Sequence, residues 1–140
     1  MSVEENKAQV RRFFEELYAA GQLNLTAFDD FYAVDIVHHS LPPGLSGLEG
    51  VKQSMAPIAG ATSNNQVNLS HLIGEGDYVV VRWEPEMTHT GELMGIPATG
   101  KRIKLSSIAI FRFAHGKVVE AWAESNLAAV MQQLQDDATA

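Results

Sequence analysis

The stretch from Trp83 to Trp122 constrains the fold most, because it is typical of three consecutive antiparallel strands. Between residues 103 and 113, one set of alternate positions is almost wholly apolar, which is the period of a strand with a buried face. A glycine-punctuated connection at 91–100 precedes this strand, and His115-Gly116 turns into a last strand at 118–123. A sheet of this kind needs a second layer to cover its apolar face.

The N-terminal part of the chain can supply that layer as helices. Ser2 and Glu5 have the spacing of a capping box, and a helical stripe of apolar residues follows them. The stripe consists of Val10, Phe13, Phe14, Leu17 and Tyr18. We expect a short helix over residues 25–32, a strand over 34–39 and a third helix from Ser46 to about 58, where Ser46 and Glu49 form a second capping box.

Two further strands are expected between the helices and this stretch. Residues 66–73 alternate with period two, and this places Val67, Leu69 and His71 on one face, with His71 as a core histidine. Residues 78–89 form a long strand, in which Pro85 indicates an edge or a bulge. Helices followed by antiparallel strands indicate an α+β fold: a curved antiparallel sheet wrapped around the N-terminal helices, giving a cone-shaped barrel with a pocket. We expect one domain over residues 1–140, frayed at 136–140.

Composition narrows the partners that such a domain can have. The 140 residues carry a formal net charge of -7, which excludes the basic surface that nucleic acids need. The chain has no cysteine, its N-terminus lacks the features of a signal peptide, and no apolar run reaches transmembrane length. We therefore expect a cytoplasmic protein that contacts neither nucleic acid nor membrane, and whose partner is a hydrophobic small molecule.

Three segments carry a family resemblance: Glu75–Trp83, Thr88–Lys101 and Phe111–Trp122. They resemble the SnoaL-like polyketide cyclase and ester cyclase family, and the likeness extends over roughly residues 5–134. The resemblance implies a cone-shaped α+β barrel of the ketosteroid-isomerase superfamily that forms dimers or tetramers. It also implies ring closure by intramolecular aldol condensation, without metal or cofactor, while some relatives are described as hydroxylases.

The chain departs from the family pattern at one catalytic position. The cyclases of the family carry an aspartate after the last strand as general acid and base, and here Glu120 and Trp122 match that motif, but Asn126 occupies the aspartate position. An amide cannot accept a proton from carbon near neutral pH, but it can donate a hydrogen bond to an enolate oxygen. Asn126 is therefore predicted to orient the substrate, to cap the last helix, or to do both.

Histidines are the other candidates for proton transfer. His38 and His39 are adjacent on a strand and so face opposite ways. Similarity to the family favours His39 as the base. The alternative is that either histidine has only a structural role. His89, at the end of the long strand, is expected to polarise a substrate oxygen or to fix the hairpin. The histidine spacings match no metal motif, so no metal is expected, and the family resemblance implies no other cofactor.

The remaining candidates concern ligand binding and charge. Aromatic and sulfur side chains are expected to line a pocket for a flat ligand, unless they are plain core: Tyr18, Tyr32, Met94, Trp83 and Trp122. Asp35 and Glu120 are the carboxylates nearest the pocket elements. Glu120 is expected to form an ion pair with Arg82 or Arg112, or to act as a base with a raised pKa if the pocket is dry.

These features favour a cofactor-independent enzyme that acts on a hydrophobic carbonyl compound through an enolate, by aldol cyclisation or isomerisation. A non-catalytic module that binds a hydrophobic ligand and a cofactor-independent hydroxylase are the alternatives. Ile108 and Ile110 would give the sheet an apolar outward face, so a homodimer through the sheet or a tetramer is expected.

Overall fold

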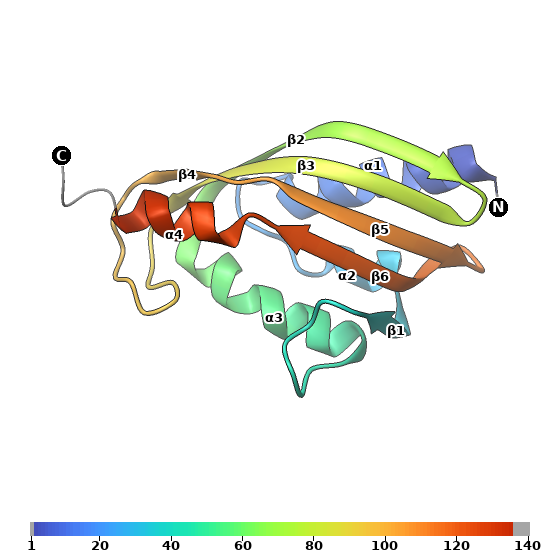
Figure 1. The fold of residues 1–140 in the computed structure, drawn as a ribbon, viewed down its shortest axis with the longest axis horizontal. Helices are drawn as coiled ribbons and strands as arrows, with labels where there is room; N and C mark the ends of the chain where they lie inside the picture. Colours follow the sequence, from blue (N-terminus) through green and yellow to red (C-terminus); the bar gives the residue numbers. More distant parts are fainter. Residues whose placement is uncertain (1, 136–140) are drawn as a thin grey trace.

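The computed structural model describes residues 2–135, and helices and strands follow in the expected order (Figure 1). The elements are α1 (Val3–Tyr18), α2 (Ala27–Phe31), β1 (Tyr32–His38), α3 (Gly47–Ala61), β2 (Thr62–Glu75), β3 (Tyr78–His89), β4 (Arg102–Lys104), β5 (Ser107–Ala114), β6 (Lys117–Ser125) and α4 (Leu127–Gln135). The predicted α+β class is confirmed. The predicted frayed tail at 136–140 lies outside the described residues.

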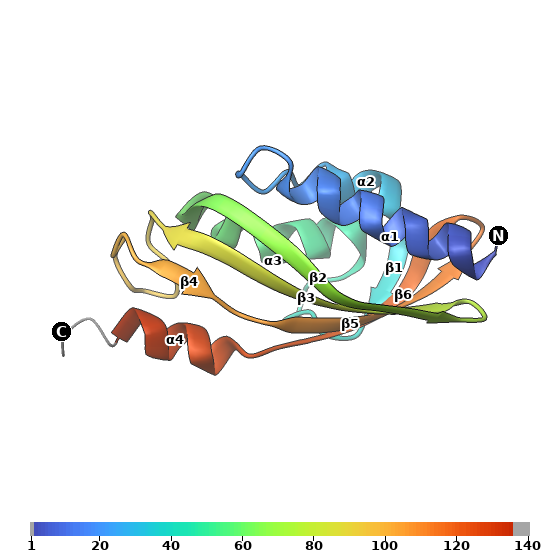
Figure 2. The same cartoon turned by 90° about the horizontal axis from the view of Figure 1, so that it is seen from above.

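The sheet is mixed and open, which refines the predicted antiparallel barrel. Its strand order is β1-β6-β5-β3-β2, and β4 also pairs with β3. β1 runs parallel to β6, whereas the other pairs are antiparallel. The sheet curves but does not close, since β1 and β2 are its two edges (Figures 1 and 2).

Apolar side chains of α1, α2 and α3 form one core with the face of the sheet that these helices cover. Val10 and Phe14 of α1 are at most 3% exposed, and the rings of Phe13 and Phe31 stack with centroids 4.1 Å apart. In Figure 2, α1 and α2 lie on one side of the sheet, while α4 lies beside β4, at the end away from the β2–β3 turn. Among residues 2–135, no helix is long and apolar enough to cross a membrane.

The two predicted capping boxes have different outcomes. The box at Ser2 is confirmed, because its hydroxyl accepts from the Glu5 N–H and its own N–H donates to the Glu5 carboxylate, both at 3.1 Å. The box at Ser46 is wrong: this side chain makes no capping hydrogen bond, and the next residue, Gly47, has a left-handed φ of +67° where the helix begins. The left-handed backbone of Gly47 therefore starts α3 without a capping hydrogen bond from the Ser46 hydroxyl.

A bulge in β2 overturns the predicted core position of His71. The pairing with β3 shifts between Leu69 and His71, so the alternation inverts there. Leu69 and Leu72 pack against the core, whereas His71 is exposed and Ile73 is 59% exposed. The face of the sheet that carries Ile73, and that the core does not cover, is called the outer face below.

Candidate functional site

A cavity of about 370 Å³ lies between the helices and the covered face of the sheet, and it is the best candidate for a site. Its walls come from α1, α2, α3, β1 and the central strands. They consist of Phe13, Phe14, Leu17, Tyr18, Phe28, Tyr32, His38, Ser40, Leu41, Val51, Ser54, Met55, Trp83, Ala109, Phe111, Ala123, Ser125 and Leu127. This lining is mostly apolar with a few polar groups, as in many small-molecule sites.

His38 is the titratable histidine of this lining. It follows the buried Ile36 by two positions on β1, so strand alternation turns it towards the cavity. Its Nδ1 accepts a hydrogen bond from the backbone N–H of Ser40 at 3.2 Å. Burial, and secondarily the charge of His39, lowers the pKa of His38, which favours the neutral imidazole. A neutral ring that accepts at Nδ1 carries its proton on Nε2.

Tyr32 places a second polar group beside His38. The two rings meet edge to face with centroids 6.3 Å apart. Tyr32 is 5% exposed, and burial raises the pKa of its hydroxyl, so the phenol stays neutral. Within residues 2–135, neither the Tyr32 hydroxyl nor His38 Nε2 has a hydrogen-bond partner. Both groups can donate to a ligand oxygen.

The other polar groups of the lining are engaged within the protein. Burial raises the pKa of the Tyr18 hydroxyl to about 12, and an interaction with the Trp83 indole partly opposes this rise. Ser54 donates to the Val51 carbonyl oxygen at 2.7 Å, and the Ser125 hydroxyl lies 2.6 Å from that of Ser107. Among the described residues 2–135, no Asp, Glu, Lys or Arg belongs to the lining. The cavity is therefore uncharged near neutral pH.

His39, the predicted base, lies on the outer face with Trp122. Its Nε2 lies 2.7 Å from a Glu120 oxygen, and its ring stacks on Trp122 with centroids 4.7 Å apart. Neither residue lines the cavity. Successive strand residues face opposite ways, so an inward His38 requires an outward His39. The predicted roles of His39 as base and of Trp122 as pocket wall do not fit this geometry.

Glu120 forms the predicted structural ion pair. Arg112 Nε lies 2.9 Å from one of its oxygens, while the other bonds to His39. The Arg112 hydrogen bond, followed by that of His39, lowers the pKa of Glu120. The alternative of a base with a raised pKa is therefore wrong. Asp35 is exposed on β1 and is also absent from the lining.

His89 and Met94 lie away from the cavity, although both were candidate site residues. His89 is fully buried, and its Nδ1 accepts from the backbone N–H of Thr99 at 3.3 Å and lies 2.9 Å from the Thr99 hydroxyl. Its Nε2 has no partner among residues 2–135. These contacts fit the second role predicted for His89, that of fixing the hairpin connection. Met94 is 45% exposed with a left-handed φ of 52°.

Asn126 joins β6 to α4 at the edge of the cavity. Its neighbours Ser125 and Leu127 line the cavity, but Asn126 itself is exposed and does not. Its side-chain oxygen accepts from the Ser106 N–H at 2.8 Å instead of capping its own helix. The amide thus fastens this junction to the segment between β4 and β5.

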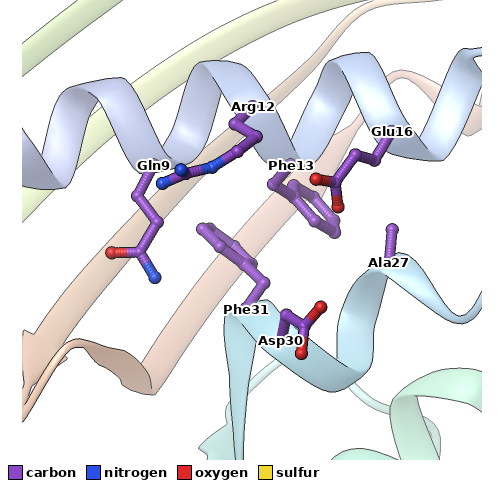
Figure 3. Close-up of a pocket in the computed structure, with 7 residues that line it drawn as sticks. All are labelled: Gln9, Arg12, Phe13, Glu16, Ala27, Asp30 and Phe31. Carbon is purple, nitrogen blue, oxygen red and sulfur yellow. The ribbon is translucent and has the colours of Figure 1, made fainter.

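A second hollow, of about 300 Å³, lies on the surface between α1 and α2 (Figure 3). Its stacked Phe13 and Phe31 rings are surrounded by three exposed charged side chains, those of Arg12, Glu16 and Asp30. Gln9 also lines this groove: its Nε2 donates to the Gly116 carbonyl oxygen at 2.8 Å, while its Oε1 is buried without a partner among residues 2–135. Among residues 2–135, no three His, Asp or Glu side chains are grouped to bind a metal.

Comparisons with known proteins agree with this architecture. The structure is similar to AclR from Streptomyces galilaeus, a proposed hydroxylase, with 29% identity, a TM-score of 0.82 and coverage of 95% of this chain and 97% of that chain. It is similar to TsrD from Streptomyces laurentii, with 27% identity, a TM-score of 0.78 and coverage of 91% and 96%. A proposed SnoaL-like polyketide cyclase from Jannaschia sp. CCS1 shares the fold at 23% identity and a TM-score of 0.80, with coverage of 94% and 92%. No protein of curated function matches the sequence significantly.

Sequence reasoning predicted Tyr18, Tyr32 and Trp83 in the lining but passed over His38 and Ser40. Alternation from the apolar Ile36 was the signal that could have selected His38. The family model for SnoaL-like polyketide cyclases matches residues 8–134, which is nearly the whole chain. The protein belongs to the SnoaL-like polyketide cyclase family.

Proposed function

We propose that the protein is a cofactor-independent enzyme that converts an uncharged, hydrophobic carbonyl compound through an enolate, by aldol cyclisation or isomerisation. The observation that carries this proposal is that two neighbouring donor side chains, His38 and Tyr32, both line the same uncharged cavity. Two neutral donors held in a mostly apolar cavity stabilise a developing oxyanion better than bulk water does. Membership of the cyclase family supports the same class of chemistry.

The proposed reaction assigns each proton and electron pair. A C–H bond next to a substrate carbonyl breaks, its proton goes to solvent water, and the electron pair moves onto the carbonyl oxygen held by His38 and Tyr32. In an aldol closure, the enolate carbon then bonds to a second carbonyl of the same molecule, whose oxygen takes a proton from water. Water is assigned the proton because no carboxylate lines the cavity. The substrate must therefore already have an acidic C–H, as in a 1,3-dicarbonyl compound.

Specific observations favour two alternative functions. The missing carboxylate favours a binding module that holds a hydrophobic ligand without turnover. The similarity to AclR, a proposed hydroxylase, favours oxygen chemistry on a reduced aromatic substrate. The fit of a hydrophobic ligand to the apolar walls is common to all three.

Solvent deuterium exchange tests the enzyme proposal. Ethyl benzoylacetate, an uncharged 1,3-dicarbonyl ester, is incubated with protein in D₂O, and loss of its central C–H signal is followed by NMR. We expect the protein to accelerate exchange, and the Tyr78→Phe variant to match it, because Tyr78 is 43% exposed and does not line the cavity. Binding without acceleration would favour the binding module, and oxygen consumption with a reduced anthraquinone would favour the hydroxylase.

We also propose a homodimer through the outer face. Ile73, Val80, Ile110 and Trp122 are neighbours in register across four strands and form an apolar row, called the outer row below. Ile73 and Ile110 are 59% and 37% exposed in the single chain. A second copy placed on the outer row would cover it, as isologous dimers do.

A cytoplasmic location stays a prediction.

A further inference from the structure

We infer that Ser40 is a positioning residue that holds His38 in the tautomer with its proton on Nε2, so that His38 serves the cavity as a donor and not as a proton acceptor. The inference rests on the proposed function for its meaning, but the tautomer is a property of the free protein. Its basis is the 3.2 Å hydrogen bond from the Ser40 N–H to His38 Nδ1.

Ser40 is itself held by a second hydrogen bond, on its side chain. Its Oγ accepts from the Ala123 N–H at 2.9 Å, and the preceding His39 N–H donates to the Ala121 carbonyl oxygen at 2.8 Å. Both contacts continue the pairing between β1 and β6 beyond the last strand residue. They fix the direction of the Ser40 N–H, which donates a hydrogen bond to the lone pair of His38 Nδ1.

The surroundings of His38 favour the neutral ring. Among residues 2–135 the cavity lining has no charged side chain, and its other titratable groups are Tyr32 and Tyr18, whose pKa values burial raises. On the outer face, His39 is the neighbour along the strand, and it pairs with Glu120. A proton on Nδ1 would point at the Ser40 N–H, where two donors would oppose each other. The neutral ring with Nε2–H avoids this conflict.

This arrangement predicts what can replace His38. The amide N–H of glutamine can occupy the place of Nε2–H, while glutamine cannot accept a proton near neutral pH. If His38 only donates, His38→Gln keeps deuterium exchange within about threefold of wild type. If His38 were the base, exchange would fall by the 10²–10⁴-fold, in order of magnitude, that general-base catalysis contributes.

NMR of ¹⁵N-histidine-labelled protein at pH 7 tests the inference directly. The His38 signals are assigned by their absence in His38→Gln. We expect an unprotonated Nδ1 and a protonated Nε2. An Nδ1–H tautomer or an imidazolium at this pH would overturn the inference.

Two serine variants separate positioning from general stability. Ser40→Ala keeps the N–H but loses the bond from Ala123, so the ratio of Nδ1–H to Nε2–H tautomer should rise about fivefold, the equivalent of one ordinary hydrogen bond. Ser54→Ala also removes a hydroxyl from the lining and should leave the ratio unchanged. Equal ratios in wild type and Ser40→Ala, or a shift in both variants, would contradict a positioning role for Ser40.

The two claims fail in different experiments. If wild type does not accelerate exchange but shows the Nε2–H tautomer, the proposed function fails and the role of Ser40 stands. If wild type accelerates exchange with an Nδ1–H tautomer, the role of Ser40 fails and the enzyme proposal stands. Loss of exchange in a folded His38→Gln protein would contradict the donor-only role.

Discussion

Two adjacent histidines illustrate how a single residue position decides the chemistry available to this protein. His38 faces an uncharged cavity, and burial lowers its pKa. His39 faces outward onto Trp122 and shares Glu120 with Arg112. Histidine is thus a neutral donor on one side of the strand and a hydrogen-bond partner of the Glu120 carboxylate on the other.

The buried contact between Tyr18 and Trp83 should contribute measurably to stability. Tyr18→Phe removes the hydroxyl that interacts with the Trp83 indole. We expect the free energy of unfolding to fall by about 1 kcal/mol, the contribution of one ordinary hydrogen bond. Urea unfolding measures this change. Tyr78→Phe, at an exposed position, should shift stability by less than about 0.5 kcal/mol, and an equal loss in both variants would contradict the account.

At the scale of elements, the junction between β6 and α4 depends on Asn126. Asn126→Ala removes the acceptor for the Ser106 N–H, and we expect a loss of about 1 kcal/mol in unfolding free energy. Amide hydrogen exchange at Ser106 should speed up in the same variant. Asn126→Asp keeps an acceptor oxygen and serves as the control.

The Asn126→Asp variant also restores the aspartate that the cyclases of the family carry at this position. A carboxylate at position 126 would accept the Ser106 N–H, which lowers its pKa, and its position lies outside the lining. We therefore expect Asn126→Asp to exchange protons of ethyl benzoylacetate no faster than wild type. Faster exchange in this variant would show that position 126 reaches the substrate.

Local patterns predicted the elements well, because helix stripes and strand alternation depend on near neighbours. The stripe from Val10 to Leu17 is buried, and β3 has its expected bounds. Features set by distant partners were missed. The bulge at Leu69–His71 inverts the face of His71, and the strand expected over 103–113 divides at Leu105–Ser106 into β4 and β5.

The site was predicted in part for the same reason. Tyr18, Tyr32 and Trp83 were predicted from their side-chain type, because aromatic rings suit the wall of a pocket for a flat ligand, and all three line the cavity. His39 was preferred over His38 by family similarity, although the direction of β1 depends on its pairing with β6. The position of Asn126 depends on a contact 20 residues away, with Ser106, that no local pattern reveals.

At the scale of the whole molecule, stability should depend on pH through His38. Its folded pKa lies below the ordinary 6.5, so the unfolded chain binds more protons as pH falls below 6.5. Its contribution to folding is complete above pH 6.5 and is lost progressively down to the folded pKa. Urea midpoints measured between pH 7.5 and pH 5 should fall more steeply in wild type than in His38→Gln; parallel curves would contradict this assignment.

Assembly through the outer row is the second prediction for the whole molecule. Ile110→Lys places a charge in the middle of the outer row and should convert the proposed dimer to monomer, which sedimentation velocity can detect. Val34→Lys is the matched control, because Val34 is 81% exposed but does not belong to the outer row. A wild-type protein that sediments as a monomer, or equal effects of both variants, would contradict the dimer proposal.

The central claim is that the cavity containing His38, and not the outer cluster containing His39, is the site of chemistry. Deuterium exchange of ethyl benzoylacetate in His38→Ala and His39→Ala tests it most directly, with circular dichroism to confirm that both variants fold. We predict that His38→Ala loses about 10²-fold or more of the acceleration, the scale of one oxyanion donor, while His39→Ala stays near wild type. Retained exchange in His38→Ala together with loss in His39→Ala would contradict the account.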